Sequence, residues 1–278
     1  SNSVLVGMLT ETGYDKAESD GKTVFTAKNF DEIKETWGQG MQFVSENAVQ
    51  DDNSGIFFST SKKNGFSAYT EDNAKETDIT VNFSPNKRSA GYKKTKDVAG
   101  NKFFDVNDNT TAEEFGEKLK SLNLTKETPL KVNIAGNGLN EAKDMDQKEF
   151  DNKVYKFLKM VKDAGFNVVY VRTGGQTGAD EAGAMAGRKL GIVTEVHGPA
   201  DWIFRQQDGK DIKDETAYKE RFARTLNVEE IQAVNTESDN ASKTVSESVS
   251  NVGTPVVQST HEQPQQKPSI QQQTQNVK

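Results

Sequence analysis

The stretch "VRTGGQTGADEAG" (residues 171–183) decides the fold, because it joins an apolar segment to an alanine-rich one through three glycines. The segment that leads into it, "NVVYVR" (167–172), is short, apolar and β-branched, which indicates a strand buried on both faces. The segment that follows, "DEAGAMAGRKL" (180–190), is typical of a helix with one face of very small side chains. The sequence therefore predicts a sharp strand-to-helix turn between these two segments.

The chain on either side of this turn alternates between strand and helix patterns. The segments "LKVNIAG" (130–136) and "IVTEV" (192–196) are predicted to be strands. Before the central strand, Asp146 and Glu149 form a capping-box pattern, and apolar residues recur at helical spacing up to Gly165. This alternation predicts an α/β fold over residues 126–226, a Rossmann-like parallel sheet flanked by helices.

The rest of the chain divides into two parts. Residues 1–125 hold a helix pattern capped by Thr111, a strand pattern "DITVNF" (78–83) and a hairpin pattern around Asn64-Gly65, which together predict an α+β region of unknown function. Residues 227–278 are rich in Ser, Thr, Gln and Asn and hold no Phe, Trp or Tyr. Such a segment buries too little surface to offset its ordering entropy, so we expect a disordered tail.

The composition narrows the classes of function. Hydrophobic residues make up 33% of the chain, the net charge is −7 and the isoelectric point is near 5.1, which argues against a mainly electrostatic nucleic-acid or membrane-surface binder. The absence of cysteine excludes disulfides, zinc–thiolate sites and cysteine nucleophiles, and is compatible with a cytoplasmic protein. No apolar run approaches the roughly 20 residues of a membrane span. The polar start without Met leads us to expect a part of a longer protein, and oligomerisation stays open.

The glycine-rich turn can hold an anion. Its glycines let a ligand approach the backbone closely, and the N–H groups that open the next helix favour a phosphate. Thr177 can cap that helix, and Gln176 can donate a hydrogen bond from its amide. The turn is not a P-loop, because it lacks the Gly-Lys-Ser/Thr ending, and it misses the GxGxxG fingerprint because Thr173 stands at the first glycine. One glycine would suffice for a turn without a ligand, so three favour a binding role.

The segment "RTGGQTGADEAGAMAGRKLGI" (172–192) resembles the signature of the SLOG superfamily, and "VNIAGNGLN" (132–140) resembles its first strand and glycine loop. That superfamily includes molybdenum-cofactor carrier proteins, the DNA-processing protein of natural transformation and lysine-decarboxylase-like phosphoribohydrolases. The resemblance covers roughly residues 130–200 and implies a nucleotide or nucleotide-derived ligand held across two glycine loops. The ligand-binding residues it implies are Gly136, Asn137, Gly138, Thr173, Gly174, Gly175, Gln176, Thr177 and Gly178.

Two acidic residues, Asp180 and Glu181, open the alanine-rich helix and are the candidate catalytic groups. Aligned on the double glycine, Glu181 matches the catalytic glutamate in the PGGxGTxxE motif of the phosphoribohydrolases. Thr177-Gly178 reverses the Gly-Thr order of that motif, however. The simpler interpretation is that both carboxylates complement the helix dipole.

Other candidates lie outside the glycine loop. His197 follows the last predicted strand, at the edge of the sheet where open α/β folds bind ligands. Arg205 can clamp a phosphate through its planar guanidinium. The basic segment "SPNKRSAGYKKTK" (84–96) can contact nucleic acid, but a solvated loop is the more common case.

Four functions follow from these features. The first is a module that binds, senses or carries a nucleotide-type phosphate compound. The alternatives are an N-glycosidic hydrolase acting on a nucleotide, a molybdenum-cofactor carrier, and a structural or interaction module of a larger phage protein. The sequence requires no cofactor, the molybdenum cofactor would be a ligand, and whether the chain is an enzyme stays open.

Overall fold

The computed structural model describes residues 17–19, 22–24, 27–52, 54–67 and 69–224, with side chains described from residue 34 onward. The tail predicted over residues 227–278 lies outside this set. Within it, no helix combines the length and the apolar character needed to cross a bilayer.

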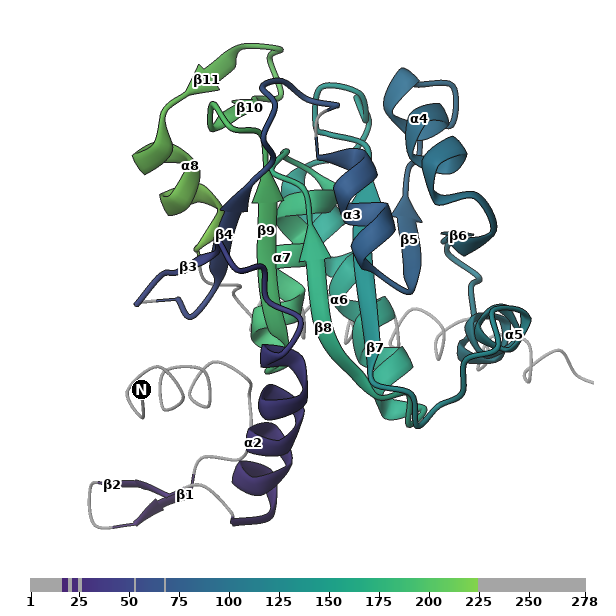
Figure 1. Ribbon diagram of the computed structural model, residues 1–278, viewed down its shortest axis with the longest axis vertical. Helices are drawn as coiled ribbons and strands as arrows, with labels where there is room; N and C mark the ends of the chain where they lie inside the picture. Colours follow the sequence, from purple (N-terminus) through teal and green to yellow (C-terminus); the bar gives the residue numbers. More distant parts are fainter. Residues whose placement is uncertain (1–16, 20–21, 25–26, 53, 68, 225–278) are drawn as a thin grey trace, which may run out of the picture. The chain divides into compact units, whose positions relative to one another are not determined.

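A seven-stranded sheet forms the centre of the fold, and all its neighbouring strands are parallel except the first pair (Figure 1). Its strands, in spatial order, are β3 (Val49–Gln50), β4 (Phe57–Thr60), β9 (Val193–Gly198), β8 (Val168–Thr173), β7 (Leu130–Gly136), β5 (Ile79–Phe83) and β6 (Phe103–Asp105). The α/β fold with a Rossmann-like sheet is thus confirmed.

Helices cover both faces of this sheet (Figure 1). One face carries α2 (Ala27–Met41), α3 (Thr70–Glu76) and α4 (Ala90–Ala99). The other carries α5 (Ala112–Ser121), α6 (Gln147–Asp163) and α7 (Ala179–Lys189). Two short antiparallel pairs, β1 (Ala17–Ser19) with β2 (Lys22–Val24) and β10 (Ile203–Arg205) with β11 (Asp211–Lys213), stand apart from the main sheet, and α8 (Glu215–Phe222) is the last described helix.

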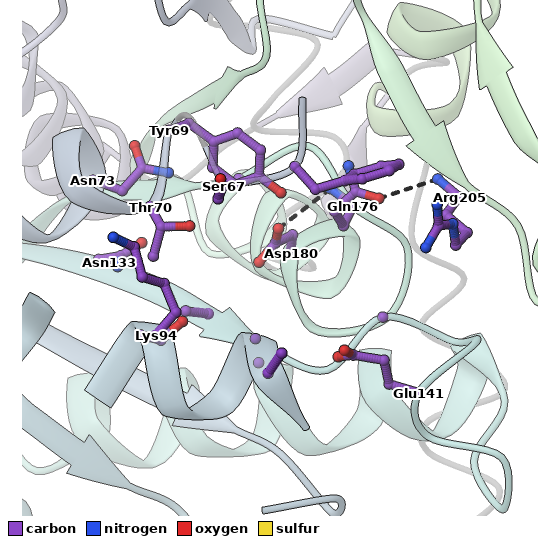
Figure 2. Close-up of a pocket in the computed structure, with 18 of the residues that line it drawn as sticks. Ser67, Tyr69, Thr70, Asn73, Lys94, Asn133, Glu141, Gln176, Asp180 and Arg205 are labelled. Atoms are coloured by element: carbon purple, nitrogen blue, oxygen red, sulfur yellow. Dashed lines mark hydrogen bonds between the residues drawn. The ribbon is translucent and has the colours of Figure 1, made fainter. Parts of the chain in front are cut away.

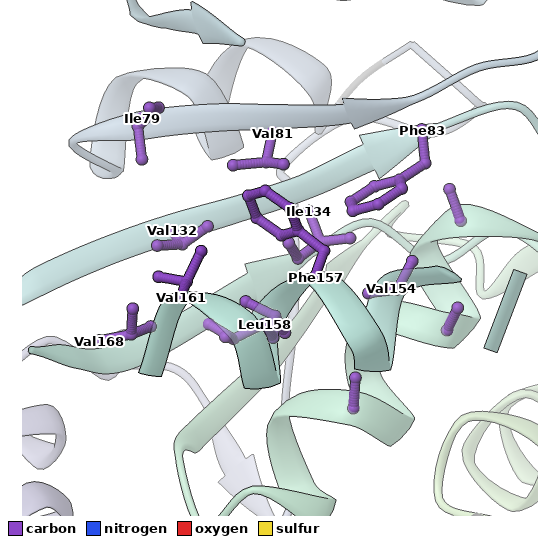
Figure 3. Close-up of a cluster of buried hydrophobic side chains, with 14 of the residues drawn as sticks. Ile79, Val81, Phe83, Val132, Ile134, Val154, Phe157, Leu158, Val161 and Val168 are labelled. Carbon is purple, nitrogen blue, oxygen red and sulfur yellow. The ribbon is translucent and has the colours of Figure 1, made fainter. Parts of the chain in front are cut away.

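Local sequence signals set the helix ends. Asp146 and Glu149 form the predicted capping box at the start of α6, and Thr111 forms the corresponding one at α5. Gly165 follows α6 with a φ of 86°, a left-handed conformation that costs glycine least. The helical stripe of α6 packs its buried side chains against the strands (Figure 3). Those side chains are Phe150, Val154, Phe157, Leu158 and Val161.

Small residues let α7 lie directly on the sheet, as its composition predicts. A Cβ atom at Gly183 would fall 2.8 Å from the Cβ of Ile134, and one at Gly187 would fall 2.4 Å from Thr194 Oγ1. Both distances are too short for real atoms. The two glycines therefore offset their low helix propensity by allowing close packing.

Strands from both sides of residue 125 belong to the same sheet. β4, β5 and β6 come from the region that the sequence analysis set apart as α+β, whereas β7, β8 and β9 come from the predicted Rossmann-like region. Residue 125 therefore does not separate two sheets.

The hairpin predicted around Asn64-Gly65 is wrong. Gly65 has a φ of 89°, as a turn glycine should, but the chain continues into α3 rather than into a returning strand. Both edges of β4 are already occupied, by β3 and by β9. No edge remains for the strand that a hairpin would need.

Candidate ligand-binding cleft

The topology creates a crevice between β5 and β7. The chain runs from β5 through α4 to β6 in one direction, and from β7 through α6 to β8 in the other. Open α/β sheets bind ligands at such a reversal point, outside the carboxyl ends of the strands. A cleft of about 340 Å³ lies there, on the face that carries α3 and α4 (Figure 2).

The floor of the cleft contains a buried amide without a full set of partners. Asn133 on β7 is 3% exposed, and its Nδ2 donates to Thr80 Oγ1 at 3.2 Å. Its Oδ1 accepts no hydrogen bond from the described part of the protein. Leaving a buried acceptor unsatisfied costs about 1–3 kcal/mol. A ligand that donates a hydrogen bond to Asn133 would recover that free energy.

Asp180 lies in the first turn of α7 and faces the same cleft (Figure 2). It is 7% exposed, and its Oδ2 accepts a hydrogen bond from the backbone N–H of Gln176 at 3.3 Å. Burial raises the pKa of Asp180 to about 8, and the nearby carboxylate of Glu141 adds to the shift. At neutral pH this carboxyl group is mainly protonated and can donate a hydrogen bond.

Glu141 stands beside the start of α4. Its Oε2 accepts from the side-chain amide of Asn137 at 3.1 Å, and a Cβ atom at Gly91 would lie 3.4 Å from the same oxygen. Gly91 belongs to the first turn of α4, where the helix dipole favours negative charge. No sequence motif points to Glu141 as a site residue.

Two cations stand on opposite sides of the cleft (Figure 2). Lys94 of α4 pairs with Glu71 at 2.6 Å. Arg205 of β10 makes two hydrogen bonds to Asp211, at 2.6 and 2.9 Å, and lies over the ring of Phe66 at 4.5 Å. Both pairs are partly exposed, so a ligand anion can compete for them at small cost.

Three backbone N–H groups between residues 176 and 179 donate hydrogen bonds within the protein. Gln176 N donates to Asp180, Gly178 N donates to Gln147 Oε1 at 2.7 Å, and Ala179 N donates to the carbonyl of Asn137 at 3.2 Å. At these three positions the protein itself supplies the acceptor, and the phosphate cradle over residues 174–178 stays a prediction.

The side chains of the loop hold neighbouring segments in place. Gln176 donates to the carbonyl of Ile203 at 3.1 Å and accepts from the N–H of Arg205 at 3.1 Å, so its amide pairs with β10 as a strand would. Thr177 Oγ1 donates to the carbonyl of Arg205 at 2.8 Å. Thr173 Oγ1 donates to the carbonyl of Asp180 at 2.8 Å.

The remaining loop residues divide between the cleft and the interior. Gly136, Gly138 and Gly174 line the cleft. Gly175 instead faces Tyr218, whose hydroxyl would lie 1.5 Å from a Cβ atom placed on that glycine. Asn137 is fully buried and accepts from Asn86 N at 2.8 Å, which ties the loop after β7 to the loop after β5.

Glu181 points away from the cleft, toward α8. Its carboxylate accepts from Arg221 Nε at 2.8 Å and from Arg224 Nε at 2.6 Å. Burial raises the pKa of Glu181, against the opposing effect of these two arginines. The structure thus separates the two acidic residues that the sequence placed together.

His197 lies outside the cleft, in a buried polar network. Its Nδ1 is 2.7 Å from Ser59 Oγ, and its Nε2 is 3.2 Å from Asp72 Oδ2 on α3. This resembles a Ser-His-Asp arrangement, but Ser59 is 2% exposed and donates to Glu195 Oε1 at 2.5 Å. Burial lowers the pKa of His197, and the Arg172 guanidinium adds to this effect. Ser59 is therefore in no position to attack a substrate.

The network continues toward the cleft through Asn73. Glu195 is fully buried and accepts from Tyr170 OH at 2.8 Å and Ser45 N at 2.9 Å. Burial alone would raise the pKa of Glu195, but Arg172 and these hydrogen bonds hold it below its usual range. Arg172 Nε donates to Asn73 Oδ1 at 2.7 Å, and Asn73 lines the cleft. This charged network therefore holds Asn73 in its position in the wall of the cleft.

Four cleft residues were not predicted from the sequence because they come from the start of α3, the interior of β7 and the loop after β7, and Lys94 was predicted only as part of the basic segment 84–96. The four are Tyr69, Asn73, Asn133 and Glu141. One signal was available for Asn133: an amide inside the apolar segment "LKVNIAG" must find partners within the fold.

Comparisons with protein-family models, with curated proteins and with solved structures found no match to this chain.

Proposed function

We propose that the cleft binds a nucleotide-type ligand, with its nucleoside part inside and its phosphate at the rim. The unpartnered Oδ1 of Asn133 carries this proposal, because it calls for a ligand that donates a hydrogen bond at the floor. The location of the cleft and its volume of about 340 Å³ support a small organic ligand. The resemblance to the SLOG superfamily implies a ligand of the same class.

The charges in the cleft support this orientation. Asp180 and Glu141 both line it, and carboxyl groups bind ribose hydroxyls or an exocyclic amine better than they bind a phosphate. Lys94 and Arg205 can exchange their exposed partners for a phosphate. In this arrangement the glycine loop shapes the wall without holding the phosphate itself.

Aromatic side chains line the side of the cleft that leads to α3. Phe66 and Tyr69 both face it, and Tyr69 is 6% exposed. Flat rings offer a nucleobase an apolar surface on which to stack. The Arg205 guanidinium already lies over Phe66, so a phosphate on Arg205 would bring the base toward this wall.

The test uses two matched asparagines. Asn133 and Asn152 each have a buried amide oxygen without a partner among the described residues, but only Asn133 lines the cleft. Binding of AMP, ADP-ribose and NAD would be measured by isothermal titration calorimetry for N133L, N152L and the unaltered protein. N133L should weaken binding by about tenfold or more, whereas N152L should not change it. Equal affinities for all three proteins, or no binding by the folded protein, would refute the proposal.

A second candidate function, hydrolysis of an N-glycosidic bond, is favoured by the pair of carboxyl groups in the cleft. Asp180, with a pKa of about 8, can protonate a leaving base, and Glu141 can stabilise positive charge on the sugar. Glu181 has no access to the same ligand because both its oxygens bind arginines. Incubation with NAD and nucleoside monophosphates, followed by chromatography, should then show a released base for the unaltered protein and none for D180N.

A further inference from the structure

A second, larger cleft of about 640 Å³ lies on the opposite face of the sheet from the first. It opens at the carboxyl ends of β5 and β6, between α6 and the loops at residues 84–87 and 106–110. Its size falls within the range of roughly 300–1,000 Å³ that is usual for small-molecule sites. None of the functions considered above uses this cleft.

The floor of this cleft is apolar and aromatic. Phe83, Phe150 and Phe157 are at most 5% exposed, and the rings of Phe83 and Phe157 meet edge to face at 5.6 Å (Figure 3). Met145 and Met160 flank them, partly buried. Methionine side chains adapt to ligands of different shape. Such a floor can therefore bind the apolar part of a ligand, and the exact shape of that part can vary.

The rim of the cleft is cationic, although the whole chain has a net charge of −7. It carries three lysines, Lys87, Lys153 and Lys156, and one acidic residue, Asp108, and Lys87 pairs with Asp105 outside the cleft lining. Lys153 pairs with Asp108 at 2.7 Å, and both side chains are exposed. Lys156 has no ion-pair partner within residues 34–224 as the structure describes them. Its ammonium group is therefore available to an anion.

Helical spacing brings the floor and the rim together. On α6, Phe150, Lys153, Phe157 and Met160 follow one another at intervals of three or four residues and form one stripe. Lys156 lies beside this stripe, so its ammonium stands at the edge of the apolar surface. A ligand held there needs an apolar body and an anionic end at adjacent positions.

We infer that this cleft binds an amphipathic carboxylate, whose apolar chain lies on the phenylalanine floor and whose carboxylate meets Lys156. The inference is independent of the function proposed for the first cleft, because the two clefts share no lining residue. The ligand of this cleft is a small molecule. Binding of a peptide or of a second copy of the chain is an alternative outcome that the experiment must distinguish.

The experiment compares two fluorescent probes with the same aromatic body. One, 1-anilinonaphthalene-8-sulfonate, carries an anionic group, whereas N-phenyl-1-naphthylamine is neutral. The anionic probe should bind the folded protein more tightly, and dodecanoate should displace it while dodecanol displaces it less. Near-ultraviolet circular dichroism would check that the protein is folded, because loosely packed states also bind such dyes.

Two lysines of α6 provide the matched variants. Lys156 lines the cleft, whereas Lys159 is on the same helix, outside the cleft, and pairs with Asp163. K156E should weaken binding of dodecanoate by about fivefold, whereas K159E and N133L should leave it unchanged. Equal effects of K156E and K159E, no displacement by dodecanoate, or a probe signal that tracks self-association in sedimentation would overturn the inference.

Discussion

Burial raises the pKa of Asp180, so that its carboxyl group titrates close to neutral pH. Its pKa of about 8 in the folded protein lies far above the ordinary value of 3.8. Since the folded state holds the proton more tightly, the group contributes stability that is fully present below pH 3.8. That contribution is lost as the pH rises through about 8, at about 1.4 kcal/mol per pH unit.

Asparagine at position 180 should remove this pH dependence. The amide has the shape of the protonated carboxyl and does not ionise, so D180N should gain stability relative to the unaltered protein as the pH rises from 5 to 8. The difference should level off above pH 8. Urea denaturation of both proteins at several pH values measures it, and a difference independent of pH would show that Asp180 titrates normally.

Packing against Tyr218 requires a glycine at position 175. A Cβ atom there would lie 1.5 Å from the Tyr218 hydroxyl. We therefore expect G175A to destabilise the fold by about 1–3 kcal/mol, through overpacking. Gly38 in α2 is the matched control, since a Cβ atom there meets nothing within 4 Å. G38A should stabilise the folded protein by about 0.5–1 kcal/mol. Thermal unfolding of G175A and G38A would measure both effects.

The glycine loop shows which residues of the candidate site could be predicted from the sequence. The sequence correctly placed a strand-to-helix turn at residues 174–178, and of the candidates it named, Gly136, Gly138, Gly174, Gln176, Asp180 and Arg205 line the cleft. It could not show which acceptors fill the loop amides. The acceptor for Gly178 N is Gln147, 31 residues away, and only the packing of α6 on α7 brings the two together.

At the scale of elements, the buried carboxylate of Glu181 on α7 forms an ion pair with Arg221 on α8. Glu181 is 1% exposed and accepts from both Arg221 and Arg224. Replacing it with glutamine removes the charge partner of Arg221, whereas Arg224 keeps its ion pair with Asp151 at 2.6 Å. Because both arginines are partly exposed, we expect E181Q to lose about 3 kcal/mol, the low end for a broken buried pair. Guanidinium denaturation would measure this loss.

The control for this variant is E215Q, because Glu215 pairs with Lys219 at the surface of α8. An exposed pair of this kind contributes at most about 0.5 kcal/mol. A loss for E181Q no larger than that for E215Q would mean that the buried pair does not hold α8 in place.

Helices were easier to predict than strand pairings, because their signals are local. The capping boxes at α5 and α6 lie within four residues of sequence, and both are present in the structure. The Asn64-Gly65 pattern is equally local, but a hairpin also depends on which strand edges are free. β4 pairs with β9, which lies more than 130 residues later in the chain. Nothing in the local sequence indicates that partner.

At the scale of the molecule, the described chain up to residue 224 belongs to one compact unit. Residues 126–226 alone would lack β4 and β5, which pair with the outer edges of β9 and β7, and also β6, which pairs with β5. Open parallel edges of this kind favour aggregation. We therefore expect the 126–226 fragment not to unfold cooperatively, whereas residues 1–228 should unfold in one transition by calorimetry. A cooperative transition for the fragment would support a domain boundary near residue 125.

The pairing of Gln176 with β10 links the loop beside the first cleft to a tryptophan, whose intrinsic fluorescence can therefore report on ligand binding. Trp202 immediately precedes β10 and stacks edge to face on Tyr218, at 5.3 Å between ring centroids. The only other tryptophan, Trp37, packs on Phe57 of β4. Because Gln176 holds β10 to the loop beside the first cleft, we expect a displacement of that loop by a ligand to change the surroundings of Trp202. With Trp37 replaced by phenylalanine, the emission of a single native indole would follow occupancy of the cleft without any attached label.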